Sequence, residues 1–303
     1  METMTLENDQ MLISLCPPFG ARVITLRDKR TGRDWIGAGA CVGSAADDAE
    51  FGRDAATGWD ECFPTVTSCV SPDGRRLRDH GELWGRPWDI TAVSATSVTA
   101  LRSSAQFGFE RTLTLTGGAL VCQYRIENRS DDPMEYLWAM HALFALTERD
   151  RIEIATGTPC QVTFCTDRNA QGSIAWPAGA AFPLDQVQPI HRSFAAKLLI
   201  DDGPGGGVQI GDAAGSLAIT AAKQFAGSTG IWLCYGGWPG ANGVHQVAIE
   251  PTSAPADDLT TARTMGRAIT IQPGRSARWW TRLALGPGLS TPDPKMIVAN
   301  GAF

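Results

Sequence analysis

The sequence predicts an all-β fold, and two observations support this prediction. The 303 residues include 33 glycines and 18 prolines, which interrupt the chain so often that few windows can hold a helix of several turns. Several segments also alternate apolar and polar residues with the period of two that is typical of β-strands. Because no linker or shift in composition divides the sequence, we expect a single domain over residues 1–303, built from many short strands.

The clearest pair of strands is expected in residues 109–128, on either side of Gly117 and Gly118. Two glycines suit the two-residue turn of a hairpin, because both can adopt a positive φ without a Cβ clash. The alternating apolar positions are Phe109, Leu113 and Leu115 before the turn, and Leu120, Cys122, Tyr124 and Ile126 after it. Three more segments show a strand, turn, strand pattern, namely residues 21–35, 66–84 and 267–285.

Charge and hydropathy argue against several classes of partner. The chain carries 26 Lys and Arg residues against 32 Asp and Glu, a net charge of −6, and no basic stripe that could follow a phosphate backbone. We therefore expect no nucleic acid as a partner. No apolar run approaches the roughly 18 residues that a bilayer-spanning helix requires, so we expect no membrane association. The N-terminal segment METMTLENDQM has acidic residues where a secretory signal is basic, which favours a cytoplasmic location.

Eight cysteines are spread along the chain, and none shows the CxxC spacing of zinc or redox motifs. A reduced cysteine behaves as a small hydrophobic residue, and a chain of this length does not need disulfides to compensate for a small core. We expect most of these thiols to be reduced and partly buried.

His80 has the most suggestive surroundings of the four histidines. It lies in DHGELWGRPW (residues 79–88), with two tryptophans and Arg86 close by. Aromatic faces beside hydrogen-bonding groups suit sugars, whose C–H groups stack on rings while their hydroxyls pair with polar side chains. The alternative is a strand with a hydrogen-bonded core histidine.

His141 and Glu250 are two further candidates for acid and base chemistry. His141 lies in the apolar segment EYLWAMHALFAL, where burial and a neighbouring carboxylate can shift its pKa. Glu250 ends an apolar strand just before a proline, a position from which a rigid element can present a side chain to a cleft. A structural histidine and a surface glutamate are the alternatives.

Three motifs, in this order, resemble the aldose 1-epimerase (galactose mutarotase) family. DHGELWGRPW is similar to the family's histidine-glycine segment, and MHALF (residues 140–144) to its His-x-x-Phe. IEPTSAPADDL (residues 249–259) is similar to the strand with the family's catalytic glutamate. The segments at residues 17–36 and 278–286 resemble the family's opening hairpin and closing strand, so the resemblance covers nearly the whole chain.

This resemblance implies a galactose mutarotase-like β-supersandwich with a broad concave sheet that holds a small-molecule sugar. It also implies interconversion of the α and β anomers of an aldose or modified aldose, without a cofactor. By resemblance, Glu250 is the general base for the anomeric hydroxyl, His141 the general acid for the ring oxygen, and His80 a stabiliser of charge at that oxygen. A glutamate with a pKa raised by burial and a protonated histidine would both suit these roles.

The chain departs from the family where substrate contacts are expected. Galactose mutarotases have a sugar-contacting arginine shortly before the histidine-glycine motif, whereas residues 58–66 read GWDECFPTV, with Asp60 and Glu61 in that region. The family also uses an aspartate between the acid and the base, for which Asp185 in FPLDQVQP is the candidate, although no motif anchors it.

Other residues are candidates for substrate binding. Arg78, with Arg75 and Arg76, follows a Pro-Asp-Gly turn and can recognise a phosphate or carboxylate, although charges beside a turn are usually solvated. Trp238 in YGGWPG is the expected stacking residue, with a core tryptophan as the alternative, and Lys197 is a candidate for the cleft wall.

Two other hypotheses are compatible with the sequence. A carbohydrate-binding or sugar-sensing protein without turnover would explain the missing arginine. Metal-assisted chemistry is less favoured, because the two histidines and the glutamate show no HxH or HxxxH spacing, and we expect no bound metal. A monomer and a homodimer are both compatible with the sequence.

Overall fold

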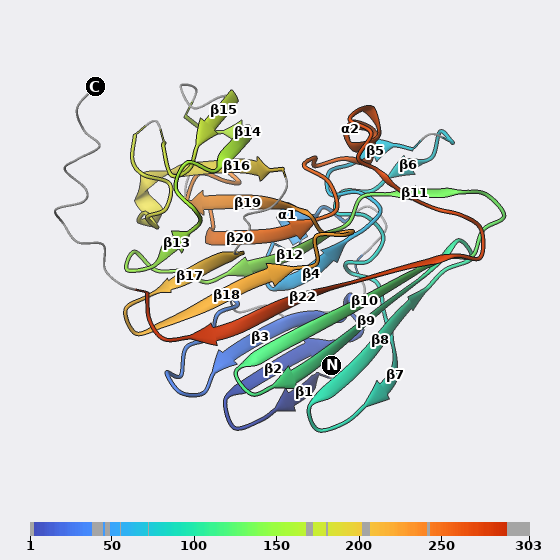
Figure 1. Cartoon of the computed structure of the whole chain (residues 1–303), viewed down its shortest axis with the longest axis horizontal. Coiled ribbons are helices and arrows are strands. Elements are labelled where there is room, and N and C mark those ends of the chain that lie inside the picture. Colours follow the sequence, from blue (N-terminus) through green and yellow to red (C-terminus); the bar gives the residue numbers. More distant parts are fainter. Residues whose placement is uncertain are drawn as a thin grey trace.

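Two large antiparallel sheets pack face to face and enclose the main hydrophobic core (Figure 1). The computed structural model describes residues 3–37, 45, 49–54, 56–71, 73–167, 172–179, 181–201, 207–240 and 243–289, without the side chains of residues 53 and 54. Strands dominate these residues, and their helices are short. The all-β prediction is therefore confirmed.

The first sheet has ten strands within the described residues. Their spatial order is β1 (Met4–Glu7), β2 (Met11–Cys16), β3 (Arg22–Asp28), β4 (Trp59–Cys62), β12 (Ala139–Phe144), β20 (His245–Thr252), β19 (Ser228–Tyr235), β16 (Phe194–Ile200), β14 (Pro159–Cys165) and β15 (Gly172–Ala175). Strands from the beginning, middle and end of the chain thus lie next to one another at its centre.

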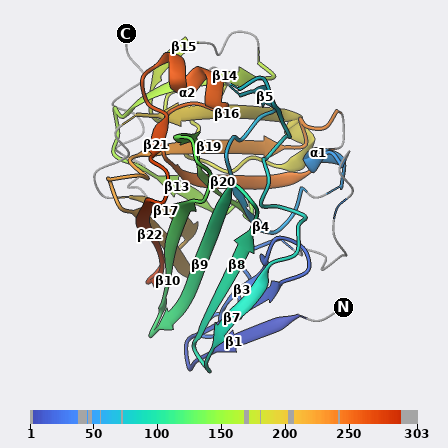
Figure 2. The ribbon, with the colours of Figure 1, turned by 90° about the vertical axis from the view of Figure 1, so that its right-hand side faces the viewer.

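The second sheet has eight strands in the same described ranges. Their order is β13 (Arg151–Glu153), β17 (Val208–Asp212), β18 (Gly215–Ala221), β22 (Ser276–Gly286), β10 (Ala119–Asn128), β9 (Phe107–Thr116), β8 (Ser97–Ser103) and β7 (Asp89–Val93). In Figure 2, strands β8, β9 and β10 of this sheet run across the direction of β16, β19 and β20 in the first sheet.

Short elements lie beside the two sheets. Two small strand pairs join β5 (Cys69–Val70) to β6 (Arg76–Leu77), and β11 (Met134–Tyr136) to β21 (Ile269–Ile271). The helical segments are α1 (Phe51–Asp54), α2 (Leu259–Thr264) and the 3₁₀ turn η1 (Ile190–Arg192). Asp258 caps the N-terminus of α2, since its carboxylate accepts the backbone N–H of Thr261 at 2.8 Å.

Side chains on β12 alternate between the two faces of the ten-stranded sheet, as β geometry requires. Met140, Ala142 and Phe144 belong to the core between the sheets, whereas Leu143 packs in a separate apolar cluster with Phe51. His141 shares the face of Leu143. The face away from the main core is therefore the one that carries this histidine.

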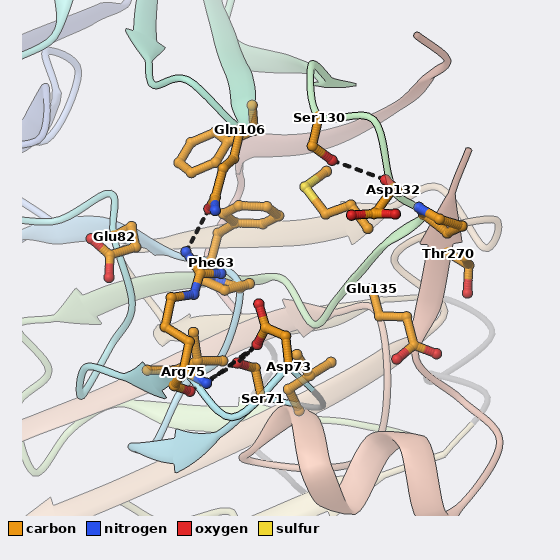
Figure 3. A pocket seen from close by; sticks show the side chains of 16 residues that line it. Phe63, Ser71, Asp73, Arg75, Glu82, Gln106, Ser130, Asp132, Glu135 and Thr270 are labelled. Carbon is orange, nitrogen blue, oxygen red and sulfur yellow. Dashed lines mark hydrogen bonds between the residues drawn. The ribbon is translucent and has the colours of Figure 1, made fainter. Parts of the chain in front are cut away.

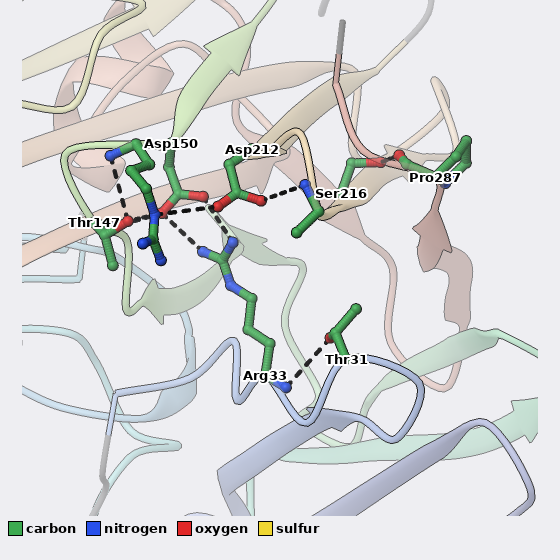
Figure 4. A network of polar contacts seen from close by, with 9 residues as sticks. Thr31, Arg33, Thr147, Asp150, Asp212, Ser216 and Pro287 are labelled. Carbon is green, nitrogen blue, oxygen red and sulfur yellow. Dashed lines mark hydrogen bonds and ion pairs between the residues drawn. The ribbon is translucent and has the colours of Figure 1, made fainter.

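An ion pair connects the two sheets near one edge (Figure 4). Arg33, shortly after β3, donates to both carboxylate oxygens of Asp150, just before β13, at 2.7 and 3.0 Å. Asp150 is fully buried and also accepts the backbone N–H and the hydroxyl of Thr147. The bidentate geometry and the additional donors compensate for the burial of this carboxylate.

The predicted strand pairs have different outcomes. The hairpin at residues 109–128 is confirmed, with Leu115 opposite Leu120 and Gly117 at φ +54°. Residues 66–84 contain the short pair β5 and β6. In residues 21–35 only the first part, β3, is a strand, and it pairs with β2. The segment that follows β3 makes only an isolated bridge, between Asp34 and Arg27. Residues 267–285 form two strands, β21 and β22, which pair with different partners.

Among the described residues, six cysteines carry free thiols, and Cys16 is disulfide-bonded. The free ones are Cys62, Cys69, Cys122, Cys160, Cys165 and Cys234, of which four are buried. Within the described ranges, no helix reaches the length and apolar character needed to cross a membrane.

Candidate active site

A cavity of about 320 Å³ opens on the face of the ten-stranded sheet that points away from the main core. It brings together Glu250, His141, His80 and Trp238, which the sequence placed far apart. Its remaining lining residues are Phe51, Gly52, Ala56, Val66, Thr67, Asp79, Leu143, Phe164, Lys197, Trp232, Gln246 and Asp257.

Glu250 and His141 come from the neighbouring strands β20 and β12. The two strands pair antiparallel with Ala142 opposite Ile249, so the next residues along, His141 and Glu250, also lie side by side. His141 Nε2 is 3.9 Å from Glu250 Oε1. Within the described residues, neither Glu250 Oε1 nor His141 Nδ1 has a hydrogen-bond partner, although both atoms are buried.

Lys197 reaches Glu250 from β16, two strands away. Its Nζ is 2.5 Å from Glu250 Oε2 and 3.4 Å from Asp257 Oδ1. Gly230 on β19 lies directly opposite Glu250, and a Cβ there would come within 3.0 Å of Oε2 and 3.2 Å of the lysine Nζ. The missing side chain at Gly230 leaves the space in which the lysine and the glutamate meet.

His80 is held by the loop that follows β6. The residue has φ +57°, and its Nδ1 is 2.9 Å from Asp79 Oδ2. The next residue, Gly81, has φ +69° and lies against the backbone of Phe63, where a Cβ would come within 2.0 Å of the carbonyl oxygen. The histidine-glycine pair therefore has a physical reason, because only glycine fits this close approach.

Aromatic rings form much of the cavity wall. Phe51 on α1 stacks on the His80 ring with a centroid distance of 3.8 Å and an interplanar angle of 8°, and it meets His141 edge-on at 5.0 Å. Trp238 and Trp232 meet edge-on at 5.8 Å. Such faces suit the C–H groups of a sugar.

Arg78 and Arg86 are outside the residues that line this cavity. Arg78 donates to the backbone carbonyls of Gly81 and Trp84 at 3.0 and 2.6 Å, and its guanidinium lies over the Trp84 ring. It therefore braces the loop that presents His80. Arg86 donates to the carbonyl of Ala45 at 3.4 Å.

Asp185 lies at a different place in the molecule. It forms an ion pair with Arg151 and lines a cavity of about 490 Å³ that shares no residue with the one around Glu250. No local motif fixed the position of Asp185. Its neighbour Gln186 forms an isolated bridge with Arg151, so Asp185 lies beside residues 151–154 and not beside the site. An aspartate that does line the cavity around Glu250 is Asp257, whose Oδ1 is 3.4 Å from Lys197 Nζ.

A third cavity, of about 480 Å³, is lined by Arg75 and by four acidic residues (Figure 3). Arg75 donates to Gln106 at 2.5 Å there. Arg75 and Arg78 therefore have other partners and do not reach the cavity around Glu250. In the part of the chain that is described, no group of three or more His, Cys, Asp or Glu side chains has the arrangement of a metal site.

Asp60 and Glu61, in the region where the family has its arginine, form two buried ion pairs. Asp60 accepts from Arg22 at 2.6 Å on the side of the sheet that carries His141, its cross-strand neighbour. Glu61 points the other way and accepts from Arg111 at 3.0 Å. Burial raises the pKa of Glu61 to about 7, although Arg111 opposes this shift.

The electrostatics of the cavity change one expectation. Burial, together with repulsion from His80, Lys197 and Arg22, lowers the pKa of His141 well below 6.5. The prediction of a protonated His141 is therefore wrong near pH 7, because the ring is neutral there. Burial also acts to lower the pKa of Lys197, but Glu250 and Asp257 outweigh it and raise that pKa above its ordinary value.

Sequence reasoning missed most polar residues around Glu250. Asp257 and Asp79 stand inside the motifs IEPTSAPADDL and DHGELW, so their proximity to Glu250 and His80 was a signal that could have been used. Gln246 precedes Glu250 by four residues on the same strand, which places both on one face. Lys197 was named for the cleft wall, but its pairing with Glu250 was not.

No protein-family model and no curated protein matches the chain. Solved structures do match it. The Slr1438 protein from Synechocystis sp. PCC 6803 aligns with a TM-score of 0.71 at 16% identity, over 94% of this chain and 96% of that one. A galactose mutarotase-like protein from Lactobacillus casei aligns with a TM-score of 0.69 at 14% identity, over 94% and 100%.

A galactose mutarotase related enzyme from Lactobacillus acidophilus gives a TM-score of 0.67 at 15% identity, over 95% of this chain and 99% of that one. At such low identities the likeness concerns the fold. The two large sheets and these alignments together show that this chain has the galactose mutarotase-like β-sandwich fold that its motifs predicted.

Proposed function

We propose that the protein is an aldose 1-epimerase-like isomerase, which interconverts the α and β anomers of a sugar in the cavity around Glu250. The observation that supports this most is the approach of Glu250 Oε1 and His141 Nε2 to 3.9 Å inside an aromatic-walled cavity. Glu250 is 1% exposed and His141 6% exposed, so both act in a largely dry environment. The fold shared with galactose mutarotase-like proteins adds support.

Ring opening requires one oxygen of the anomeric carbon to lose a proton and the other to gain one. Glu250 Oε1 is suited to accept the proton of the anomeric hydroxyl, since no other described group bonds to it. The bond from the anomeric carbon to the ring oxygen then breaks and leaves an aldehyde. Rotation of the aldehyde and closure from its other face give the second anomer.

The neutral state of His141 defines its part in this reaction. A neutral imidazole is suited to donate its Nε2–H in a hydrogen bond to the ring oxygen as negative charge develops there. The carboxylic acid formed on Glu250 then returns the proton to the ring oxygen, so the proton balance closes within one turnover. His80, oriented by Asp79 and Phe51, adds a second imidazole beside His141 at a centroid distance of 4.8 Å.

Polarimetry tests the proposal directly. Freshly dissolved α-glucose, α-galactose and a wider panel of crystalline anomers are followed with and without protein. We expect accelerated mutarotation of at least one sugar, and a loss of about 10²- to 10⁴-fold in Glu250→Gln, the usual contribution of a positioned acid or base. Glu153→Gln, which changes an exposed glutamate, is the matched control.

A sugar-binding protein without turnover is the second candidate. Asp60 favours it, because this residue is buried in an ion pair with Arg22 in the region where the family has a sugar-contacting arginine. Calorimetric binding of a sugar that the protein fails to mutarotate would support this candidate. No acceleration for any sugar, or equal rates for wild type and Glu250→Gln, would overturn the isomerase proposal.

A further inference from the structure

We infer that Lys197 is the positioning residue of this site, and that it holds Glu250 by one oxygen so that the other is presented to the sugar. This inference rests on the proposed function and deepens it. The contact that carries it is between Lys197 Nζ and Glu250 Oε2, at 2.5 Å. Oε1 of the same carboxylate is left without a partner among the described residues and faces His141.

The position of Lys197 in the sheet is unusual. It occupies the middle of β16, FAAKLLI, in which every residue is buried, and it is itself only 8% exposed. A buried ammonium is unfavourable unless it is paired with negative charge. On this face Glu250 and Asp257 provide two carboxylates, so the lysine remains charged and bound to the site.

The strand order explains why a lysine is suited to this contact. Lys197 lies opposite Trp232 on β19, and Glu250 lies opposite Gly230 on the same strand. The lysine must therefore extend across β19 to reach the glutamate on β20. Only the absence of a side chain at Gly230 leaves room for this, because a Cβ would approach both charged groups to 3.2 Å or less.

Holding one oxygen has a chemical consequence. A carboxylate that rotates freely presents either oxygen, whereas one fixed at Oε2 keeps Oε1 in place for proton transfer. The ammonium also pairs with the charge of this buried carboxylate. Lys197 does not need to touch the sugar to have either effect.

The test compares the kinetics of mutarotation at pH 7 in Lys197→Met, Lys197→Arg and wild type. In Lys197→Met we expect kcat to fall at least tenfold with a smaller change in KM, because Glu250 Oε1 is no longer held in place for proton transfer. Lys197→Arg keeps the charge and should restore much of the lost kcat. Lys223→Met, at an exposed lysine, is the matched control.

Gly230→Ala is a second variant that leaves both charged residues in place. Its methyl group would push the lysine and the glutamate apart, so we expect a lower kcat in a protein whose circular dichroism is unchanged. This variant keeps the inference testable if Lys197→Met does not fold.

The outcomes separate this inference from the proposed function. Wild-type kcat in Lys197→Met, or unchanged kcat in Gly230→Ala, overturns the role of Lys197 and leaves the isomerase intact. If wild type is inactive on all sugars, the proposed function fails. Crystal structures of wild type and Lys197→Met then decide the inference. An unchanged orientation of the Glu250 carboxylate in the variant overturns it, and a carboxylate turned away from His141 supports it.

Discussion

At the residue scale, the protonation state of His141 determines how the cavity acts on a sugar. The lowered pKa means that the neutral ring dominates at and above pH 6.5, and that protonation occurs only at lower pH. If the neutral form is active, kcat/KM for mutarotation should stay level from about pH 8 down to about pH 6.5. Polarimetry across this range measures it.

The opposite pH dependence would identify the other mechanism. If the imidazolium form of His141 were the required acid, the rate would rise steadily as the pH falls through this range. His191→Ala, which changes an exposed histidine outside the cavity, serves as the control for effects of histidine removal in general. In His141→Ala we expect a large loss of kcat at every pH.

At the scale of single elements, the loop after β6 sets the position of His80. Gly81→Ala would place a methyl group 2.0 Å from the carbonyl oxygen of Phe63, so the backbone must shift and carry His80 with it. We expect kcat/KM to fall at least tenfold. Gly74 is a matched control, since it also has a positive φ of +81° but has nothing within 4 Å of an added Cβ.

The comparison of the two alanine variants separates displacement from backbone strain. Both add the cost of a left-handed conformation, about 1–2 kcal/mol per residue. Only Gly81→Ala should also lose activity, as measured by polarimetry beside thermal unfolding. Equal activity in the two variants would mean that the position of His80 does not matter for turnover.

The elements also show what the sequence could predict. The hairpin of β9 and β10 follows from alternation around Gly117 and Gly118, since both strands and their turn are local. The pairing of Lys197 with Glu250 could not be predicted in this way. It depends on the order β16, β19, β20, which long connections determine and local patterns do not encode.

The same limit explains the outcome for other site candidates. His80, His141 and Glu250 belong to motifs, and their convergence in one cavity was the central expectation from the sequence. Asp185 was chosen by its place in the chain order alone, and it lies in another cavity. The neutral state of His141 depends on burial and on charges from three other segments, none of which its own apolar segment reveals.

At the scale of the whole molecule, the ion pair of Glu61 and Arg111 links the two large sheets through the core. Glu61 belongs to β4 in one sheet, and Arg111 to β9 in the other. Both side chains are fully buried, and Trp138, Trp59 and Tyr124 also donate to Glu61. Removing one partner of such a pair leaves an uncompensated charge, which typically costs about 3–5 kcal/mol.

Arg111→Leu should therefore destabilise the protein in a pH-dependent way. The folded-state pKa of Glu61 is raised to about 7 from 4.5, so its contribution to stability is fully present below pH 4.5 and is lost as the pH rises through 7. Without Arg111 the charged form is still less favourable. We expect a loss of about 3–5 kcal/mol in the free energy of unfolding at pH 8, and a smaller loss at pH 5.5 where Glu61 is protonated.

Urea denaturation of both proteins at the two pH values measures this difference. The double variant Glu61→Gln/Arg111→Leu should recover part of the loss at pH 8, because it removes the unpaired carboxylate along with the guanidinium. The same loss for Arg111→Leu at pH 5.5 and pH 8 would show that the charge of Glu61 is not its cause. The destabilisation would then come from the packing of the arginine between Trp59 and Trp88.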